Sequence, residues 1–466
     1  MNLPQTKDTI CALATAAGMG ALAVIRISGI DAFTIGNKIF KTKSGKEKDF
    51  NKEKTYTLHY GMIIDHDKIV DEVLVSVFRN PNSYTGEDTL EISCHGSVFI
   101  QQEILQVLQK NGARLAEPGE YTLRAFLNGK LDLAQAEAVA DLISSQHAAA
   151  HKTAIQQLRS GYSSSIKELR TRLIDFASLL ELELDFAEED VEFAHRGQLK
   201  DLVTGLLKEV TQLRESFATG NALKNGVPVV IAGKPNVGKS TLLNALLNEE
   251  KAIVSAIAGT TRDVIEDHLI IQGIRFRFMD TAGLRITDDT IEKIGVAKTY
   301  EHLDKASIVL YICDPGQSNA FELAEEIKSI QNRAGNEDLV FITVINKMDQ
   351  YESKTYFKIY NKFPNVIFIS AINRTHLHEL SDKLIAASNL QGVTGDAPLV
   401  TNARHAEALS RAEQSLNAIL AGMQHLSTDL LALELKNALY HLAEITGEVY
   451  TDDLLGNIFS KFCIGK

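Results

Sequence analysis

Apolar residues recur at helical spacing in two long stretches of the chain. Residues 119–220 and 399–466 contain no proline, and many of their apolar positions fall three or four residues apart. That spacing places apolar side chains on one face of a helix, so both stretches are predicted to be helical. The stripes are Leu133, Ala136, Ala140 and Ile143 in the first stretch, and Leu409, Ala412, Leu416, Ile419 and Leu420 in the second.

Four short apolar runs between these stretches predict the strands of an α/β domain. The runs occupy residues 229–232, 274–279, 339–345 and 366–369. The pattern therefore predicts a helical domain whose two parts, 119–220 and 386–466, flank an inserted α/β domain at 221–385.

Residues 1–118 are predicted to form a separate, compact α+β domain. Residues 70–78 and 89–94 have the composition of strands, and residues 101–111 have that of a helix.

An apolar run at residues 10–25 raises the possibility of a secretion signal. The run lacks a clearly basic start and carries Gly18 and Gly20 in its middle, which argues against such a signal. Residues 23–27 predict a strand, so these glycines are expected to form a tight turn between strands. They also match a dinucleotide-binding loop weakly, but a helix would have to follow such a loop.

The first strand of the inserted domain leads into a phosphate-binding loop. Residues 233–240 read Gly-Lys-Pro-Asn-Val-Gly-Lys-Ser, which is the P-loop spacing between a strand and a helix. Backbone N–H groups of such a loop bind phosphate oxygens. Lys239 is predicted to neutralise the β- and γ-phosphates, and Ser240 is predicted to bind Mg²⁺. The nucleotide contacts expected here are Asn236, Val237, Gly238, Lys239, Ser240 and Thr241.

Three further motifs follow later predicted strands. Asp280 is expected to hold Mg²⁺ through water, and the Gly283 N–H to meet the γ-phosphate. The Asp349 carboxylate can accept from both the N1–H and the 2-amino group of guanine, which adenine cannot supply. GTP is therefore the predicted ligand, bound at the carboxyl edge of a doubly wound parallel sheet. The motifs comprise Asp280, Thr281, Ala282 and Gly283; Asn346, Lys347, Met348 and Asp349; and Ser370, Ala371 and Ile372.

Two positions distinguish this site from that of a Ras-like GTPase. Leu284 stands where such a protein has its water-orienting glutamine, and it can neither donate nor accept a hydrogen bond. Asn236 is a neutral oxygen donor that could help to cage a monovalent cation in place of an arginine finger. The remaining cage oxygens, and Thr261 as a second Mg²⁺ ligand, would come from Ser255, Ala256, Ile257, Ala258, Gly259, Thr260 and Thr261.

Simpler roles for these residues stay open. Asn236 is also a good turn former, and Leu284 is also a good packing residue. Arg262 and Arg285 are rival donors of positive charge to the reacting phosphate.

The composition narrows the class of protein further. A chain of 466 residues and 51.2 kDa is expected to hold about three domains. Its net charge of −12 argues against a broad nucleic-acid surface, so any RNA contact should be local or supplied by a partner. The four cysteines are scattered without metal-binding spacing, which fits reduced thiols in the cytoplasm.

Short motifs along the whole chain resemble the MnmE (TrmE) family of tRNA-modification GTPases. They lie at residues 83–88, 95–96, 117–122, 125–133, 401–405, 451–456 and 462–466, the last reading Phe-Cys-Ile-Gly-Lys. The resemblance implies an N-terminal folate-binding domain that forms a homodimer, a helical domain, and an inserted G domain that pairs with its copy in the GTP state.

The resemblance also implies partners and chemistry. An MnmG-like FAD protein would join the GTPase in a heterotetramer. Together they would add an aminomethyl-type group, such as carboxymethylaminomethyl, to C5 of the wobble uridine of certain tRNAs. The one-carbon unit would come from 5-formyltetrahydrofolate or a related tetrahydrofolate, and K⁺ would activate GTP hydrolysis. No membrane span is expected.

The family's site residues map onto this chain one by one. The folate contacts would be Arg26, Glu87, Lys130 and Lys466, since arginine and lysine can hold the glutamate carboxylates of a folate and Glu87 can accept from its pterin ring. A shell of Asn236 with backbone groups of Ser255, Ile257 and Thr260 would hold K⁺. Glu292 would position the attacking water.

Three points are left undecided by the sequence. Residues 16–20 read Ala-Ala-Gly-Met-Gly, where the family pattern has two prolines and Gly-Arg-Gly, so ligand contacts of this loop are in doubt. Cys463 could act as a catalytic thiol or as a small residue that positions the tail. A GTPase that serves RNA or ribosome assembly without modification chemistry is the alternative function.

Overall fold

The computed structural model describes residues 8–159, 161–185, 196–250, 267–279, 302–333, 339–351, 353–390, 398–423, 425 and 427–465. Contacts divide the chain into two compact units. One comprises Met1–Ile143, Gln157–Leu207 and Ala408–Lys466, and the other comprises Ser144–Gln156 and Lys208–Glu407.

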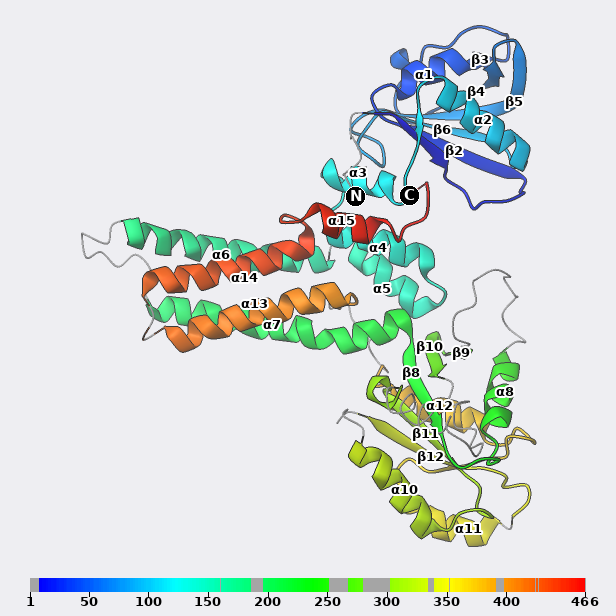
Figure 1. The fold of residues 1–466 in the computed structure, drawn as a ribbon, viewed down its shortest axis with the longest axis vertical. Coiled ribbons are helices and arrows are strands. Elements are labelled where there is room, and N and C mark those ends of the chain that lie inside the picture. Colours follow the sequence, from blue (N-terminus) through cyan, green and yellow to red (C-terminus); the bar gives the residue numbers. More distant parts are fainter. Residues whose placement is uncertain are drawn as a thin grey trace, which may run out of the picture. The chain divides into compact units, whose positions relative to one another are not determined.

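The first unit contains a seven-stranded sheet in the order β3-β4-β5-β6-β2-β1-β7 (Figure 1). Neighbouring strands are antiparallel except β1 and β7. Helices α1 (Ala32–Ile39) and α2 (Val98–Lys110) cover one face and share its apolar core, and the short helix η1 is Phe50–Lys52. The strands are β1 (Ile10–Leu13), β2 (Leu22–Ser28), β3 (Phe40–Thr42), β4 (Thr57–Asp65), β5 (Lys68–Phe78), β6 (Thr89–His95) and β7 (Arg114–Leu115).

The predicted strands and helix of this α+β domain are confirmed to within three residues at each end as β5, β6 and α2. The prediction of a tight turn at Gly18 and Gly20 is wrong. Strands β1 and β2 do pair, but residues 14–21 form a longer connection between them. Gly20 N–H donates to the Gly96 carbonyl at 3.0 Å and the Gln101 side chain donates to the Gly18 carbonyl at 3.1 Å, so the start of α2 holds this loop.

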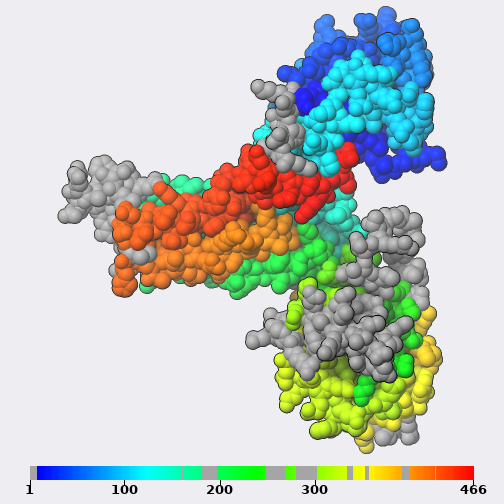
Figure 2. All heavy atoms as spheres, viewed as in Figure 1, coloured from blue at the N-terminus to red at the C-terminus, as the bar shows by residue number. Residues whose placement is uncertain are grey.

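The two proline-free stretches are helical, as predicted. Helices α6 and α14 lie alongside each other (Figure 1), and the outer side of α14 reaches the surface (Figure 2). The helices are α3 (Glu120–Leu127), α4 (Leu133–Ser144), α5 (Ala148–Leu158), α6 (Gly161–Asp185), α7 (Arg196–Asn225), α13 (Ala403–Gly422), α14 (Thr428–Thr446) and α15 (Asp452–Phe459).

The stripe predicted on α13 is largely confirmed, because Leu409, Ala412, Leu416 and Ile419 are buried. On α4 the prediction holds at the start of the helix, where Leu133 and Ala136 pack in a cluster with residues of α3 and α15. It is wrong at Ile143, which is 47% exposed, since this residue lies in the last turn of α4, beyond that cluster.

The second unit contains a six-stranded sheet in the order β13-β12-β11-β8-β10-β9, parallel except for the edge strand β9. Its strands are β8 (Val227–Ala232), β9 (Asp267–Ile271), β10 (Ile274–Met279), β11 (Ile308–Cys313), β12 (Val340–Ile345) and β13 (Ile367–Phe368). Its helices include α8 (Lys239–Glu250), α10 (Ala320–Arg333), α11 (Ser353–Tyr360) and α12 (Leu377–Ala387).

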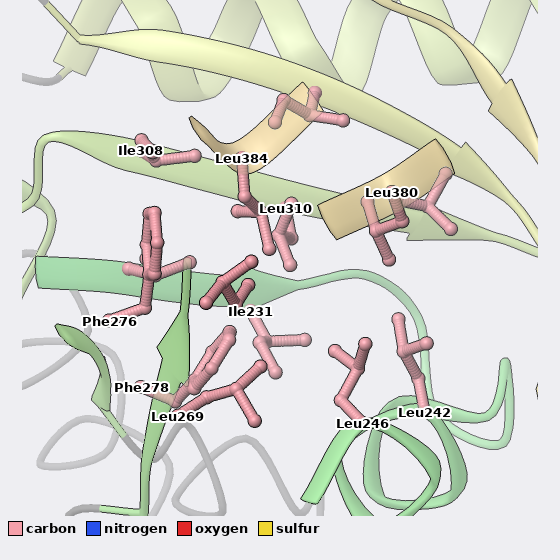
Figure 3. Packing of buried hydrophobic residues seen from close by; sticks show 14 of the residues in the cluster. Ile231, Leu242, Leu246, Leu269, Phe276, Phe278, Ile308, Leu310, Leu380 and Leu384 are labelled. Carbon is pink, nitrogen blue, oxygen red and sulfur yellow. The ribbon is translucent and has the colours of Figure 1, made fainter. Parts of the chain in front are cut away.

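Apolar clusters on the two faces of this sheet make the domain doubly wound, as predicted. One cluster joins the sheet to α8 and α12 through residues such as Ile231, Leu242 and Leu380 (Figure 3). The other joins it to α10 and α11 through residues such as Leu323 and Tyr360. The four strands predicted from apolar runs are confirmed as β8, β10, β12 and β13, whereas β11, which was not predicted, lies between β8 and β12.

None of the helices in the described part of the chain has the length and apolar character needed to cross a lipid bilayer.

A buried histidine precedes α5 in the second unit. His147 Nδ1 accepts from the Ala150 N–H at 3.3 Å, which requires that nitrogen to be unprotonated. Burial lowers the pKa of His147, and the nearby Arg275 charge lowers it further, although the carbonyls of Gly273 and Lys224 oppose this. The folded protein therefore favours the neutral ring.

Stability is accordingly expected to fall as the pH drops below about 6.5, because the unfolded chain then binds a proton that folded His147 resists. His147→Asn should keep the helix cap and remove this part of the pH dependence. Urea unfolding between pH 5.5 and 8 would show the difference. Parallel pH profiles for the two proteins would contradict the prediction.

Candidate active site

The P-loop connects β8 to α8, as the sequence predicts. Two of its glycines are sterically required: a Cβ at Gly233 would lie 2.2 Å from the Ile312 carbonyl oxygen, and one at Gly238 would lie 2.4 Å from Asn346 Nδ2. Both also have positive φ, of 139° and 101°, which glycine adopts readily. The loop therefore lies against the ends of β11 and β12.

Lys239 occupies the inside of this loop. Its Nζ donates to the carbonyls of Gly233 at 2.6 Å and Lys234 at 3.0 Å. Burial lowers the pKa of Lys239, and a phosphate beside it would raise the pKa by stabilising the ammonium form. The loop is therefore suited to a polyphosphate. Ser240 and Thr241 are exposed at the start of α8.

Asn236 lies at the tip of the P-loop with φ of +61°. Its side chain is exposed and makes no hydrogen bond with the described residues. Its amide oxygen is thus available to a ligand, and the positive φ is equally what a turn-forming asparagine adopts.

Lys234 fastens the other side of the P-loop to α10. Its Nζ lies 3.2 Å from Glu322 and 3.3 Å from Glu326. Val237 is buried beneath the loop.

The residues predicted to bind the base lie together at the ends of β12 and β13. Buried Asn346 bridges them, since its Nδ2 donates to the Val237 carbonyl at 2.9 Å and its Oδ1 accepts from the Ala371 N–H at 3.0 Å. Asn346 thereby connects the P-loop to the residues predicted to bind the base.

The Asp349 carboxylate accepts from the Ser370 hydroxyl at 2.5 Å. Asp349 itself is exposed, as is Ile372, whereas Ser370 and Ala371 are buried. An exposed carboxylate that the Ser370 hydroxyl orients fits two-point acceptance from a guanine edge.

Several predicted site residues lie outside the described residues. These are Ser255, Ala256, Ile257, Ala258, Gly259, Thr260, Thr261, Asp280, Thr281, Ala282, Gly283, Glu292 and Lys466, together with Arg262, Leu284 and Arg285.

A second group of predicted residues surrounds the loop at residues 83–88. The Arg26 guanidinium lies 5.4 Å from the centroid of the Tyr84 ring and pairs with Glu91 at 2.7 Å. Lys130 is exposed, its Nζ donates to the Pro81 carbonyl at 3.0 Å, and its side chain lies against Gly86. The structure thus brings Arg26, Glu87 and Lys130 to one loop.

Glu87 rests on a buried polar network that the sequence did not reveal. Its Oε2 accepts from the Ser28 hydroxyl at 2.8 Å, and its Oε1 lies 3.2 Å from Arg124. The Arg124 side chain is 1% exposed and also pairs with Asp8 and Glu120. The available signal was Arg124 itself, a charged residue between the apolar Leu123 and Ala125 on α3, at a position between two of the recognised motifs.

The C-terminal tail returns to the first strands of the chain. The Gly119 N–H donates to the Cys463 carbonyl at 3.3 Å, and a Cβ at Gly465 would lie 2.2 Å from the Leu13 carbonyl oxygen. Phe462 is buried against Phe459, whereas the Cys463 side chain is exposed. The residue before Lys466 therefore lies beside the end of β1.

This fold and site define a P-loop GTPase domain inserted into a helical domain that follows an α+β domain. Residues 9–130 match the family described as GTP-binding protein TrmE N-terminus, and residues 133–463 match the MnmE helical domain. The chain therefore belongs to the MnmE (TrmE) family of tRNA modification GTPases.

Individual members of the family are similar in sequence to this chain along nearly its whole length. The tRNA modification GTPase MnmE of Flavobacterium johnsoniae is 53% identical, with 99% of each chain covered. That of Bacteroides fragilis strain ATCC 25285 is 50% identical, with 99% of this chain and all of the relative covered. A solved GTP-binding protein of Sulfolobus solfataricus, in complex with GDP, is 17% identical over 51% of this chain and 72% of its own, with a TM-score of 0.29.

Proposed function

We propose that this protein is a K⁺-activated, folate-binding GTPase that modifies C5 of the wobble uridine in certain tRNAs. The observation that carries the proposal is full-length membership of the MnmE family together with a tail that returns to the N-terminal domain. The product would carry an aminomethyl-type or carboxymethylaminomethyl group. The scattered, unpaired cysteines support a cytoplasmic location.

GTP would bind between the P-loop and the base-binding residues. Ser240 and Thr261 would hold Mg²⁺ directly, and Asp280 would hold it through water. These oxygen donors suit Mg²⁺, which would neutralise charge on the phosphates. Asn236 and the loop at 255–260 would hold K⁺.

A tetrahydrofolate such as 5-formyltetrahydrofolate would bind beside the loop at 83–88 and supply the one-carbon unit. The contacts between this loop and Arg26 and Lys130 support the proposal, as do the two donors that orient Glu87. Arg26 and Lys130 would hold carboxylates of the folate, and Glu87 would accept from the pterin ring. Lys466 would complete the site.

The N-terminal sheet supports a homodimer. The face of the sheet opposite α1 and α2 carries exposed Leu58, Tyr60 and Leu74, and Tyr60 lies opposite Leu74 on adjacent strands. Exposed apolar side chains of this kind are typical of an interface. We propose that a second copy covers this face, and that an MnmG-like FAD protein completes a heterotetramer that acts on tRNA.

The C-terminal tail gives the sharpest test of the proposed function. Because Phe462 is part of a buried cluster, the deletion should remove only residues 464–466. We expect this truncation to abolish wobble-uridine modification, because Lys466 is lost, while GTP hydrolysis stays largely intact. Mass spectrometry of tRNA nucleosides from cells that depend on the truncated protein measures the first, and phosphate release measures the second.

A Cys463→Ser variant provides the matched control. Its tail keeps the carbonyl that accepts from Gly119, so modification lost in this variant would assign chemistry to the thiol. Modification retained after truncation would remove Lys466 from the site. Loss of both modification and hydrolysis would show that the tail holds the fold.

A further inference from the structure

A buried carboxylate contacts the turn that carries the proposed base-binding residues, and it belongs to none of the sequence motifs. Asp314 follows β11 and is 3% exposed. Its Oδ2 lies 2.8 Å from Lys347 Nζ, and its Oδ1 accepts from the Tyr351 hydroxyl at 2.7 Å and the Gly316 N–H at 3.0 Å. All three donors converge on a single side chain.

The Asp314 carboxylate is charged despite its burial. Burial by itself would raise the pKa of Asp314, but the hydrogen bonds from Lys347, Tyr351 and Gly316 outweigh it and hold the pKa below the usual range. A buried charge of this kind is stable only while its partners stay in place. Asp314 and Lys347 therefore fix each other's positions.

Lys347 lies within the turn that presents the base-binding side chains. Its φ is +62°, a left-handed conformation that is uncommon for residues other than glycine. Its neighbour Asn346 bonds to the P-loop, and Asp349 accepts from Ser370. A turn with this geometry needs support from the surrounding structure.

We infer that Asp314 is a positioning residue for guanine recognition, acting through Lys347 on the turn from Asn346 to Asp349. With the ammonium group held by Asp314, the Lys347 backbone keeps its left-handed conformation and Asp349 keeps its carboxylate aimed at the base edge. Tyr351, which follows Asp349 by two residues, ties the far end of the turn to the same carboxylate. The inference rests on the guanine pocket proposed above.

Asp314→Asn tests the inference in the full-length protein. The asparagine amide would face the Lys347 ammonium group with a donor, so the pair would be lost at nearly constant volume. We expect GDP to dissociate about tenfold faster, in line with the loss of a charged hydrogen bond. We also expect the preference for GDP over IDP, which lacks the 2-amino group, to shrink by about threefold or more as Asp349 loses its aim.

Stopped-flow release of fluorescent GDP and IDP measures both effects. In steady state, KM for GTP should rise while kcat at saturating GTP stays within about twofold, since a change confined to ground-state binding leaves the chemical step intact. A structural defect alone would not select between GDP and IDP.

Asp382→Asn is the matched control, because it makes the same substitution at an exposed ion pair on α12 of the same domain. It should change neither the release rate nor the base preference. A second comparison uses Lys347→Met: if Asp314 acts through Lys347, adding Asp314→Asn to that variant should have little further effect.

Two results would overturn the inference: an unchanged GDP to IDP preference in Asp314→Asn, or an equally large effect of this substitution in the Lys347→Met background. Should Asp314→Asn fail to fold, Lys347→Met alone, which removes the other member of the ion pair, must lower the preference; an unchanged preference would overturn the inference. Failure of the pocket itself would appear separately, as an unaltered base preference in Asp349→Asn.

Discussion

GTP hydrolysis by this protein is expected to run faster in K⁺ than in Na⁺, and Asn236→Ala is expected to erase the difference. Leu284 cannot orient the attacking water, so other groups must position that water and supply positive charge at the reacting phosphate. The exposed Asn236 side chain makes no hydrogen bond with the described residues and could act as a cation ligand. Na⁺ is smaller than K⁺ and should fit such a cage poorly.

In the same mechanism, Glu292 positions the attacking water. Glu292→Ala should slow turnover by roughly 10²- to 10⁴-fold, the range typical of lost acid–base or water-positioning groups. Phosphate release in K⁺ and Na⁺ buffers of equal ionic strength measures both effects. K⁺ should also promote pairing of two G domains, which sedimentation would detect.

A matched control variant distinguishes loss of the cation ligand from a general loss of stability. Asn389 also has a positive φ, of 53°, and is exposed in the same unit, so Asn389→Ala reproduces the backbone cost without touching the P-loop. It should retain the K⁺ preference. Equal rates in Na⁺ and K⁺ for the unaltered protein would eliminate the cation mechanism and turn attention to Arg262 and Arg285.

The second large effect is a change of nucleotide. Asp349→Asn should weaken GTP binding and strengthen binding of xanthosine triphosphate, each by about 1–3 kcal/mol, because an amide donor then faces the base edge. The Ser370 hydroxyl can still bond the new side chain, so the pocket should persist. Fluorescence titration with GDP and with xanthosine diphosphate measures the change in the two affinities. Unchanged GDP affinity would exclude Asp349 from the base pocket, and Asp382→Asn controls for the loss of a surface charge.

The local sequence predicted the P-loop and most of the helices and strands. The P-loop could be recognised because its backbone geometry demands glycine at fixed positions, and the neighbours of Gly233 and Gly238 show that a Cβ would indeed collide there. Helices α13 and α14 were predictable because their apolar residues recur with the period of the helix. The strand β11 was not predicted, since a short apolar run without a motif after it gave no further signal.

What lies behind the site residues was decided by tertiary structure alone. Asp314 and Lys347 are far apart in sequence, and only the parallel pairing of β11 with β12 places their strand ends together. Arg124 reaches Glu87 from another element in the same way. Spacing rules describe neighbours along one helix or strand, whereas such contacts depend on how separate elements pack. The sequence by itself therefore determined which family and which motifs are present, and the tertiary structure decided which buried charges hold those motifs in place.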